Sequence, residues 1–394
     1  MDANESRYKD WLEVRRRTGL SRELMHMTPH QPGHVTFGGA RYVNFSGNDY
    51  LGLSRHPILV ERAREWAERY GAGSGASRLV TGNLDVFENL ERKVAAFKQM
   101  PAALIMASGF QANAAVLHAL FDKQVLGAEP LVFSDRLNHA SMHFGCQAAG
   151  IRQHRYRHCD TEHLARMLEK HASEDRPKFI LTESVFSMDG DVAPMNEVAA
   201  LADRHGATLV CDDAHATGVL GRGGKGLSDG AHIVIGTFSK AMGGYGAYVT
   251  CSQTVRDFLV NRCSGLIYST ALPPAVLGAI DASLDLVASL DGERARVAAM
   301  AAKFRRNARE KEFDTGASET QIVPLIVGES DAALALSRQL REAGYWATAI
   351  RPPTVPKGTA RLRFAFSAAH GDAQLDGLLE ALPSRMAHGQ AATA

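Results

Sequence analysis

The middle of the chain alternates between short apolar runs and amphipathic stretches. Stretches with helical spacing lie between several of the runs, for example at residues 110–121 and 195–206, and the second ends at Gly206, as helices often do. Continuous apolar strands that alternate with helices are typical of a mostly parallel sheet covered by helices on both faces. We therefore predict a large α/β domain over residues 46–290. Its apolar runs are 103–108, 131–135, 179–184, 208–213, 232–239 and 247–252.

The two ends of the chain follow other patterns. Residues 1–45 hold a charged helical stretch at 8–17, a connection with proline and glycine, and a short strand-like run at 40–45. Residues 291–394 mix amphipathic helices with three short apolar strands, which predicts a smaller C-terminal α+β domain.

Composition and charge exclude several classes of protein. The 394 residues suffice for two domains, and a formal net charge of +1 indicates neither a nucleic-acid nor a membrane partner. Arg15–Arg17 are expected to form one solvated helix face. The N-terminus lacks the apolar core of a signal peptide, and no stretch reaches the roughly 18–20 apolar residues of a membrane span. The 5 cysteines form no CxxC pair, so we expect free thiols and a cytoplasmic location.

Lys240 directly follows an apolar strand and precedes a glycine-rich stretch. A lysine is costly to bury unless it is paired or used chemically, and an imine with pyridoxal phosphate is one such use. A surface lysine after a strand is the plainer alternative, so the other strand ends decide between the two.

Asp212 and Asp213 end the strand at 208–213, and His215 follows them. Pyridoxal chemistry needs a carboxylate against the pyridine nitrogen, because the protonated ring accepts carbanion electrons. Strand alternation puts the two aspartates on opposite faces, so only one of them can do this. A carboxylate that caps the following turn is the alternative for either residue.

Ser108, Gly109 and Phe110 end the strand at 103–108 and open a helix. Exposed amides at a helix start form an anion site that suits a cofactor phosphate, and glycine allows close approach. Thr237, on the strand that precedes Lys240, could add a hydroxyl to the same phosphate.

Histidines raise the question of a metal site. His139 follows the strand at 131–135, where it is either a plate stacked on the cofactor ring or an ordinary loop residue. His139 with His143, and His154 with His158, have the i, i+4 spacing of helical metal ligands. Neither pair has the third ligand or HExxH pattern of a zinc site, so we expect no metal.

Residues Gly221–Gly226 match the GxGxxG pattern of dinucleotide-binding loops. The motif does not join a strand tightly to a helix, so we do not expect a dinucleotide site there. We expect a flexible glycine loop instead. Lys225 within it belongs to no phosphate-binding P-loop.

Three arginines near the C-terminus, Arg351, Arg361 and Arg363, could bind a substrate carboxylate through the planar guanidinium. Alternation puts Arg361 and Arg363 on the same face, so one could bind substrate while the other is structural.

Together these segments resemble the α-oxoamine synthase family of fold-type I pyridoxal-phosphate enzymes, over about residues 10–385. The resemblance implies a large domain with a mostly parallel seven-stranded sheet, a smaller C-terminal domain, and a homodimer with shared active sites. The motifs that carry it are NFSGNDYLGLSRHP, GAGSGASRLVTGN, DRLNHASM, TESVFSMDGDVAPM, CDDAHATGVLG, GTFSKAMGG and IYSTALPP.

The resemblance also assigns roles to single residues. Lys240 matches the Schiff-base lysine, Asp212 the partner of the pyridine nitrogen, and His139 the stacking histidine. His215 and Ser187 match contacts of the cofactor's phenolic oxygen. Further matches are the phosphate contacts Ser108, Gly109, Phe110 and Thr237, Ser269 or Thr270 reaching the neighbouring subunit's phosphate, and the substrate contacts Arg22, Asn48, His139, Thr354 and Arg363.

The implied reaction is a decarboxylative condensation of an amino acid with an acyl thioester. The two ends of the chain resemble the biotin-pathway branch most, in which L-alanine reacts with a pimeloyl thioester of coenzyme A or a carrier protein. Glycine- or serine-using branches of the family are the alternative.

Overall fold

The computed structural model describes residues 3–384, which form two compact units. Unit 1 contains the chain up to Gly47, residues Met188–Gly190, and the chain from Ala298 onward, and unit 2 contains Asn48–Ser187 and Asp191–Val297. The three segments proposed from sequence, with boundaries near 45 and 290, stay a prediction about domains.

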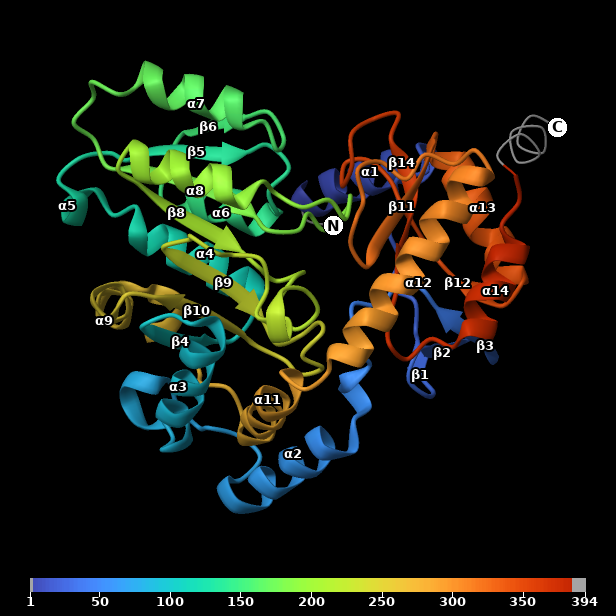
Figure 1. Ribbon diagram of the computed structural model, residues 1–394, viewed down its shortest axis with the longest axis horizontal. Coiled ribbons are helices and arrows are strands. Elements are labelled where there is room, and N and C mark those ends of the chain that lie inside the picture. Colours follow the sequence, from blue (N-terminus) through green and yellow to red (C-terminus); the bar gives the residue numbers. More distant parts are fainter. Residues whose placement is uncertain (1–2, 385–394) are drawn as a thin grey trace. The chain divides into compact units, whose positions relative to one another are not determined.

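The centre of unit 2 is a seven-stranded sheet in the order β4-β10-β9-β8-β7-β5-β6 (Figure 1). β10 runs antiparallel to both of its neighbours and the other pairings are parallel, so the predicted mostly parallel sheet is confirmed. The strands are β4 (Ala102–Met106), β5 (Leu131–Asp135), β6 (Gln153–Tyr156), β7 (Lys178–Glu183), β8 (Ala207–Asp212), β9 (Ile233–Thr237) and β10 (Ala247–Cys251). β6 was not predicted because it is an edge strand in which only Tyr156 is buried.

Helices cover both faces of this sheet, which explains why its inner strands are mainly apolar. One buried cluster joins strand residues to α4, α6 and α9, and the other joins them to α7 and α8 (Figure 1). The helices of unit 2 are α2 (Pro57–Tyr70), α3 (Val86–Lys98), α4 (Gly109–Leu120), α5 (Lys123–Leu126), α6 (Ala140–Ala148), α7 (Thr161–Lys170), α8 (Met195–Arg204), α9 (Gln253–Arg262), α10 (Ser264–Ile267) and α11 (Pro274–Val287), with short helical turns η1 (Leu53–Arg55), η2 (Arg78–Gly82) and η3 (Arg222–Gly224).

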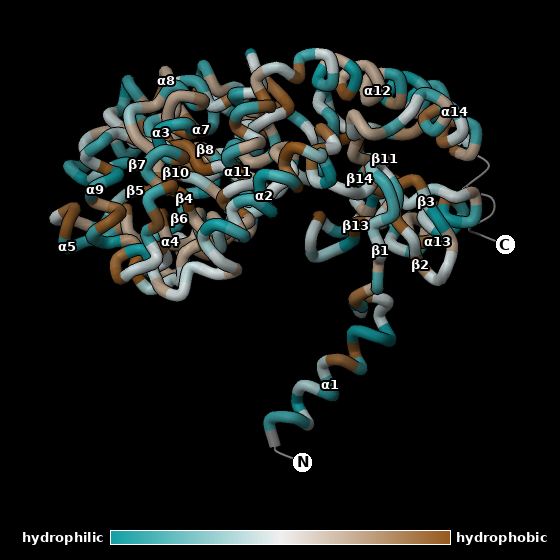
Figure 2. Tube along the Cα trace, turned by 90° about the horizontal axis from the view of Figure 1, so that it is seen from below, coloured by the Kyte–Doolittle hydropathy of each residue, from teal (hydrophilic) through white to brown (hydrophobic). Residues whose placement is uncertain are grey.

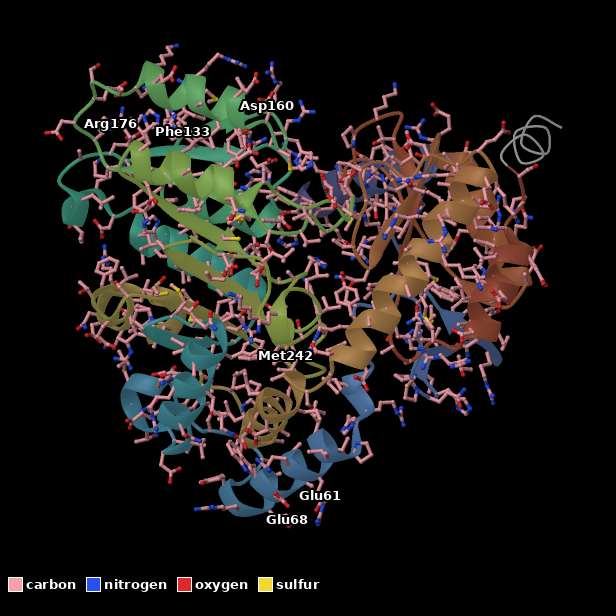
Figure 3. The ribbon with its side chains drawn as sticks, in the orientation of Figure 1. Glu61, Glu68, Phe133, Asp160, Arg176 and Met242 are labelled. Carbon is pink, nitrogen blue, oxygen red and sulfur yellow. The ribbon has the colours of Figure 1, made fainter. Side chains whose placement is uncertain are left out.

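Local signals fix where several of these helices begin. The Ser108 side chain caps α4 by accepting from the Gln111 amide, and the Asp160 side chain caps α7 by accepting from the His163 amide at 2.7 Å. The outer face of α2 carries Glu61 and Glu68, which both lie exposed (Figure 3).

Unit 1 contains two small sheets, in the orders β1-β2-β3-β12 and β11-β14-β13. Its long N-terminal helix is mainly hydrophilic and extends away from these sheets (Figure 2). The elements are α1 (Ala3–Arg17), β1 (Thr28–Pro29), β2 (His34–Phe37), β3 (Ala40–Asn44), β11 (Ile322–Gly328), α13 (Ser330–Glu342), β12 (Tyr345–Trp346), β13 (Thr348–Ile350), β14 (Ala360–Ala365) and α14 (Asp372–Ala381); α12 (Asp291–Glu310) begins in unit 2 and ends in unit 1. Among residues 3–384, no helix is long and apolar enough to cross a membrane.

Candidate active site

Asp212, the last residue of β8, lies at the carboxyl end of the sheet, where ligands bind in open α/β folds. Its side chain is buried and accepts hydrogen bonds from Asn113 Nδ2 at 2.6 Å and from the Ala214 amide at 2.9 Å. Asn113 also donates to Ser141 Oγ at 3.0 Å, and that hydroxyl pairs with His139 Nδ1 at 2.7 Å. A continuous hydrogen-bond chain therefore links the predicted aspartate to the predicted stacking histidine.

Lys240 belongs to the same group of residues. The charges of Asp212 and Lys240 both act on His139, whose pKa is lowered first of all by burial. His139 is therefore a neutral ring near neutral pH. Figure 3 labels Met242 in the turn that follows Lys240; this turn is fixed where Ser283 Oγ donates to the Met242 carbonyl at 2.7 Å.

His215 is held by a residue that the sequence did not single out. Tyr50 Oη lies 2.8 Å from His215 Nδ1 and donates to Asn48 Oδ1 at 3.1 Å. Asn48, predicted to contact substrate, is thus connected to His215, predicted to contact the cofactor. No sequence signal joins residues 165 positions apart, so only the fold reveals Tyr50.

The start of α4 forms the predicted anion site. Gly109 lies beside Thr237, because a Cβ added to the glycine would meet the Thr237 Cβ at 3.8 Å and little else. Thr237 Oγ1 pairs with Ser239 Oγ at 2.7 Å, which adds a second hydroxyl. The helix amides, the space at Gly109 and these hydroxyls together suit a phosphate.

The remaining predicted phosphate residues border this turn. Ser269 Oγ accepts from Gln111 Nε2 at 2.9 Å, and Thr270 forms an isolated bridge with Ser77. Phe110 is 49% exposed, and its ring centroid lies 5.5 Å from that of Phe144.

Asp213 lies on the other side of the strand end. Its carboxylate accepts from Lys98 Nζ at 2.7 Å, Ser184 Oγ at 2.5 Å and the Leu227 amide at 3.1 Å. Thr217 Oγ1 adds a further hydrogen bond at 3.1 Å. These partners give Asp213 a structural role, and Asp212 remains as the cofactor candidate.

Glu183 is a second site residue that was not predicted from the sequence. It pairs in register with Asp212 on the adjacent strand, so the two side chains point to the same face. Burial, and then the Asp212 charge, raises its pKa well above the usual range for glutamate. Its Oε1 is buried and without a hydrogen-bond partner among the described residues. The register of two neighbouring acidic strand ends was the available signal.

Two candidates of unit 1 lie together. Arg22 Nη2 donates to Thr354 Oγ1 at 3.0 Å. Both line a groove of about 640 Å³ whose other walls come from residues 20–25, from α13 and from residues 346–352. The groove combines four arginines and one glutamate with apolar walls, including Trp346, which suits an aliphatic chain that ends in an anion.

The C-terminal arginines differ in their partners. Arg361 forms an ion pair with Asp189 and is therefore committed to unit 1 itself. Arg351 donates to the Gly19 carbonyl. Arg363 is buried on β14, and its contact with a substrate carboxylate stays a prediction, as does the cofactor contact of Ser187 in unit 2.

The structure also places the His154–His158 pair and the glycine motif that the sequence analysis considered. His154 lies on β6 and His158 in the turn after it, so the two do not share a helix. The glycine motif at 221–226 forms a loop with only the short turn η3, and a Cβ on Gly226 would lie 1.7 Å from Asp213 Oδ2. That loop therefore packs on the structural aspartate.

The residues of unit 2 fit pyridoxal phosphate. A lysine and a buried carboxylate whose charges both act on one neutral histidine, and a helix N-terminus with a glycine, provide the donor set that this cofactor requires. No described residue bonds the buried Oε1 of Glu183, so this site is not internally satisfied.

Comparison with known proteins agrees with this geometry. The family model for class I and II aminotransferases matches residues 40–382. A putative 8-amino-7-oxononanoate synthase of Paramagnetospirillum magneticum is 56% identical over 97% of both chains. The 8-amino-7-oxononanoate synthase of Gluconacetobacter diazotrophicus is 54% identical over 93% of both chains.

Solved structures show the same fold. A serine palmitoyltransferase from S. paucimobilis, determined with a PLP–myriocin aldimine bound, superposes with a TM-score of 0.89 at 25% identity over 100% of both chains. The 8-amino-7-oxononanoate synthase of Francisella tularensis gives a TM-score of 0.75 at 27% identity, over 89% of this chain and 99% of that one. The chain belongs to the class I and II aminotransferase family, in its α-oxoamine synthase branch.

Proposed function

We propose that the protein binds pyridoxal 5′-phosphate and condenses L-alanine with a pimeloyl thioester, releasing carbon dioxide, free thiol and 8-amino-7-oxononanoate for biotin synthesis. The observation that carries the proposal is the grouping of Lys240, Asp212 and His139 at one end of the sheet. The 56% identity to a protein with the corresponding name supports the choice of substrates.

When bound, pyridoxal phosphate supplies an electron sink that stabilises negative charge at the α-carbon of the amino acid. Asp212 would keep the ring nitrogen protonated through a carboxylate that Asn113 orients. Lys240 Nζ would hold the cofactor and, once released from it, move the α-proton. His139 would lie against the ring as a neutral plate, since its pKa is lowered.

The start of α4, with Thr237, would bind the phosphate, and His215 and Ser187 would contact the phenolic oxygen. Tyr50 supports this role, because its hydroxyl fixes the ring of His215. Arg22 and Thr354 would bind the carboxylate end of the acyl chain, and Arg363 the carboxylate of the amino acid. The arginine-lined groove of unit 1 supports the acyl assignment.

The proposed assembly is a homodimer in which Ser269 or Thr270 reaches the neighbouring subunit's phosphate. Large exposed apolar side chains of unit 2 support a covered surface: Leu79, Val80, Phe110, Phe144 and Tyr268. Light scattering on the purified protein tests this assembly, and a monomer would contradict it. All 5 cysteines are free, which supports a cytoplasmic location.

A thiol-release assay tests the reaction. L-Alanine, glycine and L-serine are each combined with pimeloyl, acetyl, succinyl and palmitoyl thioesters, the pimeloyl group on both coenzyme A and a carrier protein. We expect alanine with a pimeloyl donor to release thiol fastest. Preference for glycine, or for serine with palmitoyl-CoA, would instead assign the chain to 2-amino-3-ketobutyrate ligase, 5-aminolevulinate synthase or serine palmitoyltransferase chemistry. The similarity to the solved serine palmitoyltransferase makes the serine arm the necessary competitor.

A further inference from the structure

Three loops of the candidate site meet at one histidine outside it. β5, β6 and β7 are neighbouring parallel strands, so the segments that follow them leave the same edge of the sheet. The segment after β5 carries His139, and the segment after β7 carries Ser187. The turn after the edge strand β6 carries His158, just before the capped start of α7 at Asp160 (Figure 3).

His158 joins the other two segments through both of its ring nitrogens. Nδ1 lies 3.0 Å from Asp135 Oδ1, and Nε2 lies 2.7 Å from Asp191 Oδ2. The edge of the Phe186 ring packs against the imidazole, with centroids 4.4 Å apart and planes at 89°. The histidine side chain is 17% exposed, that of Asp191 is 11% exposed and that of Asp135 is fully buried.

Asp135 and Asp191 also hold their own loops, Asp135 through its carboxylate and Asp191 through its backbone carbonyl. Asp135 accepts from the Leu137 amide at 2.9 Å and from the Cys159 amide at 2.8 Å. Cys159 has a φ of 51°, a backbone conformation that a residue other than glycine adopts only when its surroundings enforce it. The Asp191 carbonyl accepts from the Phe186 amide at 3.1 Å, which closes the loop around Ser187.

Only a protonated imidazole satisfies this arrangement. A neutral imidazole has one N–H, whereas two carboxylates on opposite ring nitrogens both require a donor. Burial opposes the charged form, but the hydrogen bonds that the ring donates to Asp135 and Asp191 outweigh it and raise the pKa of His158 to about 12. Cys159 is a further titratable group beside the ring, and burial raises its own pKa.

The same side chains do not form a metal site. Asp135, His158 and Cys159 are close enough together to suggest one. However, a metal ion binds one ring nitrogen, whereas the carboxylates occupy both. Cys159 Sγ lies 3.8 Å from Nδ1 and 3.7 Å from Nε2, so it lies along the lone pair of neither nitrogen.

We propose that His158 is a positioning residue of the active site: as an imidazolium held between Asp135 and Asp191, it fixes the two loops that carry His139 and Ser187. The inference rests on the proposed function only in that these two residues contact the cofactor. His158 itself touches neither cofactor nor substrate and acts through the loops that it joins.

Two variants separate the hydrogen bond of His158 to Asp135 from its hydrogen bond to Asp191. Asn places its amide nitrogen near the former Nδ1, so H158N keeps a donor for Asp135 and loses the one for Asp191. Gln places its nitrogen near the former Nε2, so H158Q does the reverse. H154Q is the matched control, because His154 lies on the preceding strand against the aromatic rings of Phe133 and His171 and, within residues 3–384, bonds no carboxylate.

In ¹⁵N-histidine-labelled protein, the ring signals that disappear in H158N should show an imidazolium from about pH 6 to about pH 9, where free histidine becomes neutral. We also expect the dissociation constant of pyridoxal phosphate to rise about tenfold in H158N and H158Q, with an altered circular dichroism of the bound cofactor, and to stay within about twofold in H154Q. H158N/D191N should bind the cofactor no more weakly than H158N, because both substitutions remove the same hydrogen bond, that between residues 158 and 191.

Several results would overturn the inference. These are a His158 ring that loses its proton near pH 6.5, stoichiometric zinc that is absent from H158N, or wild-type cofactor affinity and dichroism in both variants. If H158N does not fold, H158Q and Asp191→Asn carry the comparison. Wild-type protein that binds no pyridoxal phosphate would contradict the proposed function, while the imidazolium signal would still test the link.

Discussion

The end of β8 presents two aspartates in opposite surroundings. Asp213 accepts from a lysine, two hydroxyls and a backbone amide, and it supports the glycine loop through Gly226. Asp212 accepts from one side-chain amide and one backbone amide, and it pairs in register with Glu183, whose Oε1 has no partner within residues 3–384. One carboxylate is therefore satisfied by the fold, and the other has capacity left for a ligand.

Of these two consecutive residues, Asp213 therefore stabilises the fold and Asp212 is the candidate for chemistry. Burial lowers the pKa of Lys98, but the Asp213 carboxylate has the larger effect and raises it. The face of β8 that carries Asp213 therefore holds a stable ion pair. On the front, the low pKa of His139 and the high pKa of Glu183 both result first from burial, and such groups concentrate at functional sites.

The largest expected effect is on the Asp212 side. Asp212→Asn should lower the rate of thiol release by roughly 10²- to 10³-fold, the size seen when one preorganised electrostatic contact is lost. The free energy of unfolding should fall by only about 1–3 kcal/mol, because Asn has one acceptor oxygen and leaves either Asn113 Nδ2 or the Ala214 amide without its acceptor. Assay and urea unfolding on the same preparation check this, and full activity would remove Asp212 from the mechanism.

On the Asp213 side the expected loss is of stability. Lys98→Met leaves a buried charge without its partner, which costs about 3–5 kcal/mol. Lys98→Met/Asp213→Asn should recover most of that loss, since no unpaired charge remains. Urea unfolding measures both; equal stability of Lys98→Met and wild type would show that the pair contributes nothing.

A pair of glycine substitutions sharpens the contrast. Gly226→Ala forces a Cβ to 1.7 Å from Asp213 Oδ2 at a φ of +94°, so we expect a loss of at least about 1–3 kcal/mol of stability. Gly109→Ala meets only ordinary contact at Thr237, so stability should change within about 0.5 kcal/mol. The added methyl group obstructs the phosphate, and cofactor affinity should fall about tenfold. Unchanged affinity would argue against the anion site.

The smallest effect concerns pH. The folded-state pKa of His158 lies above the unfolded value, so its contribution to stability is complete below about pH 6.5 and declines as pH rises toward the folded value of about 12. The stability difference between wild type and H158N should therefore shrink between about pH 6.5 and about pH 9. Urea unfolding at several pH values measures it; a difference that grows over this range would contradict the sign.

Sequence patterns predicted much of this arrangement because strand ends are visible in a sequence. The apolar runs located most of the sheet, and the parallel pairing then implied that Lys240, Asp212 and Gly109 share one edge. Alternation could place Asp212 and Asp213 on opposite faces but could not choose between them. Lys98, 115 positions away, makes that choice through a contact that only the fold creates. Tyr50 was missed for the same reason.

The central claim is that Lys240 holds pyridoxal phosphate beside Asp212. The most direct test is borohydride reduction of the cofactor-saturated protein, which fixes the cofactor to its lysine, followed by peptide mass mapping. We expect one label per chain on the peptide with Lys240, and none in Lys240→Ala. A label on Lys98 or Lys225, or a protein that reduction leaves unlabelled, would contradict it.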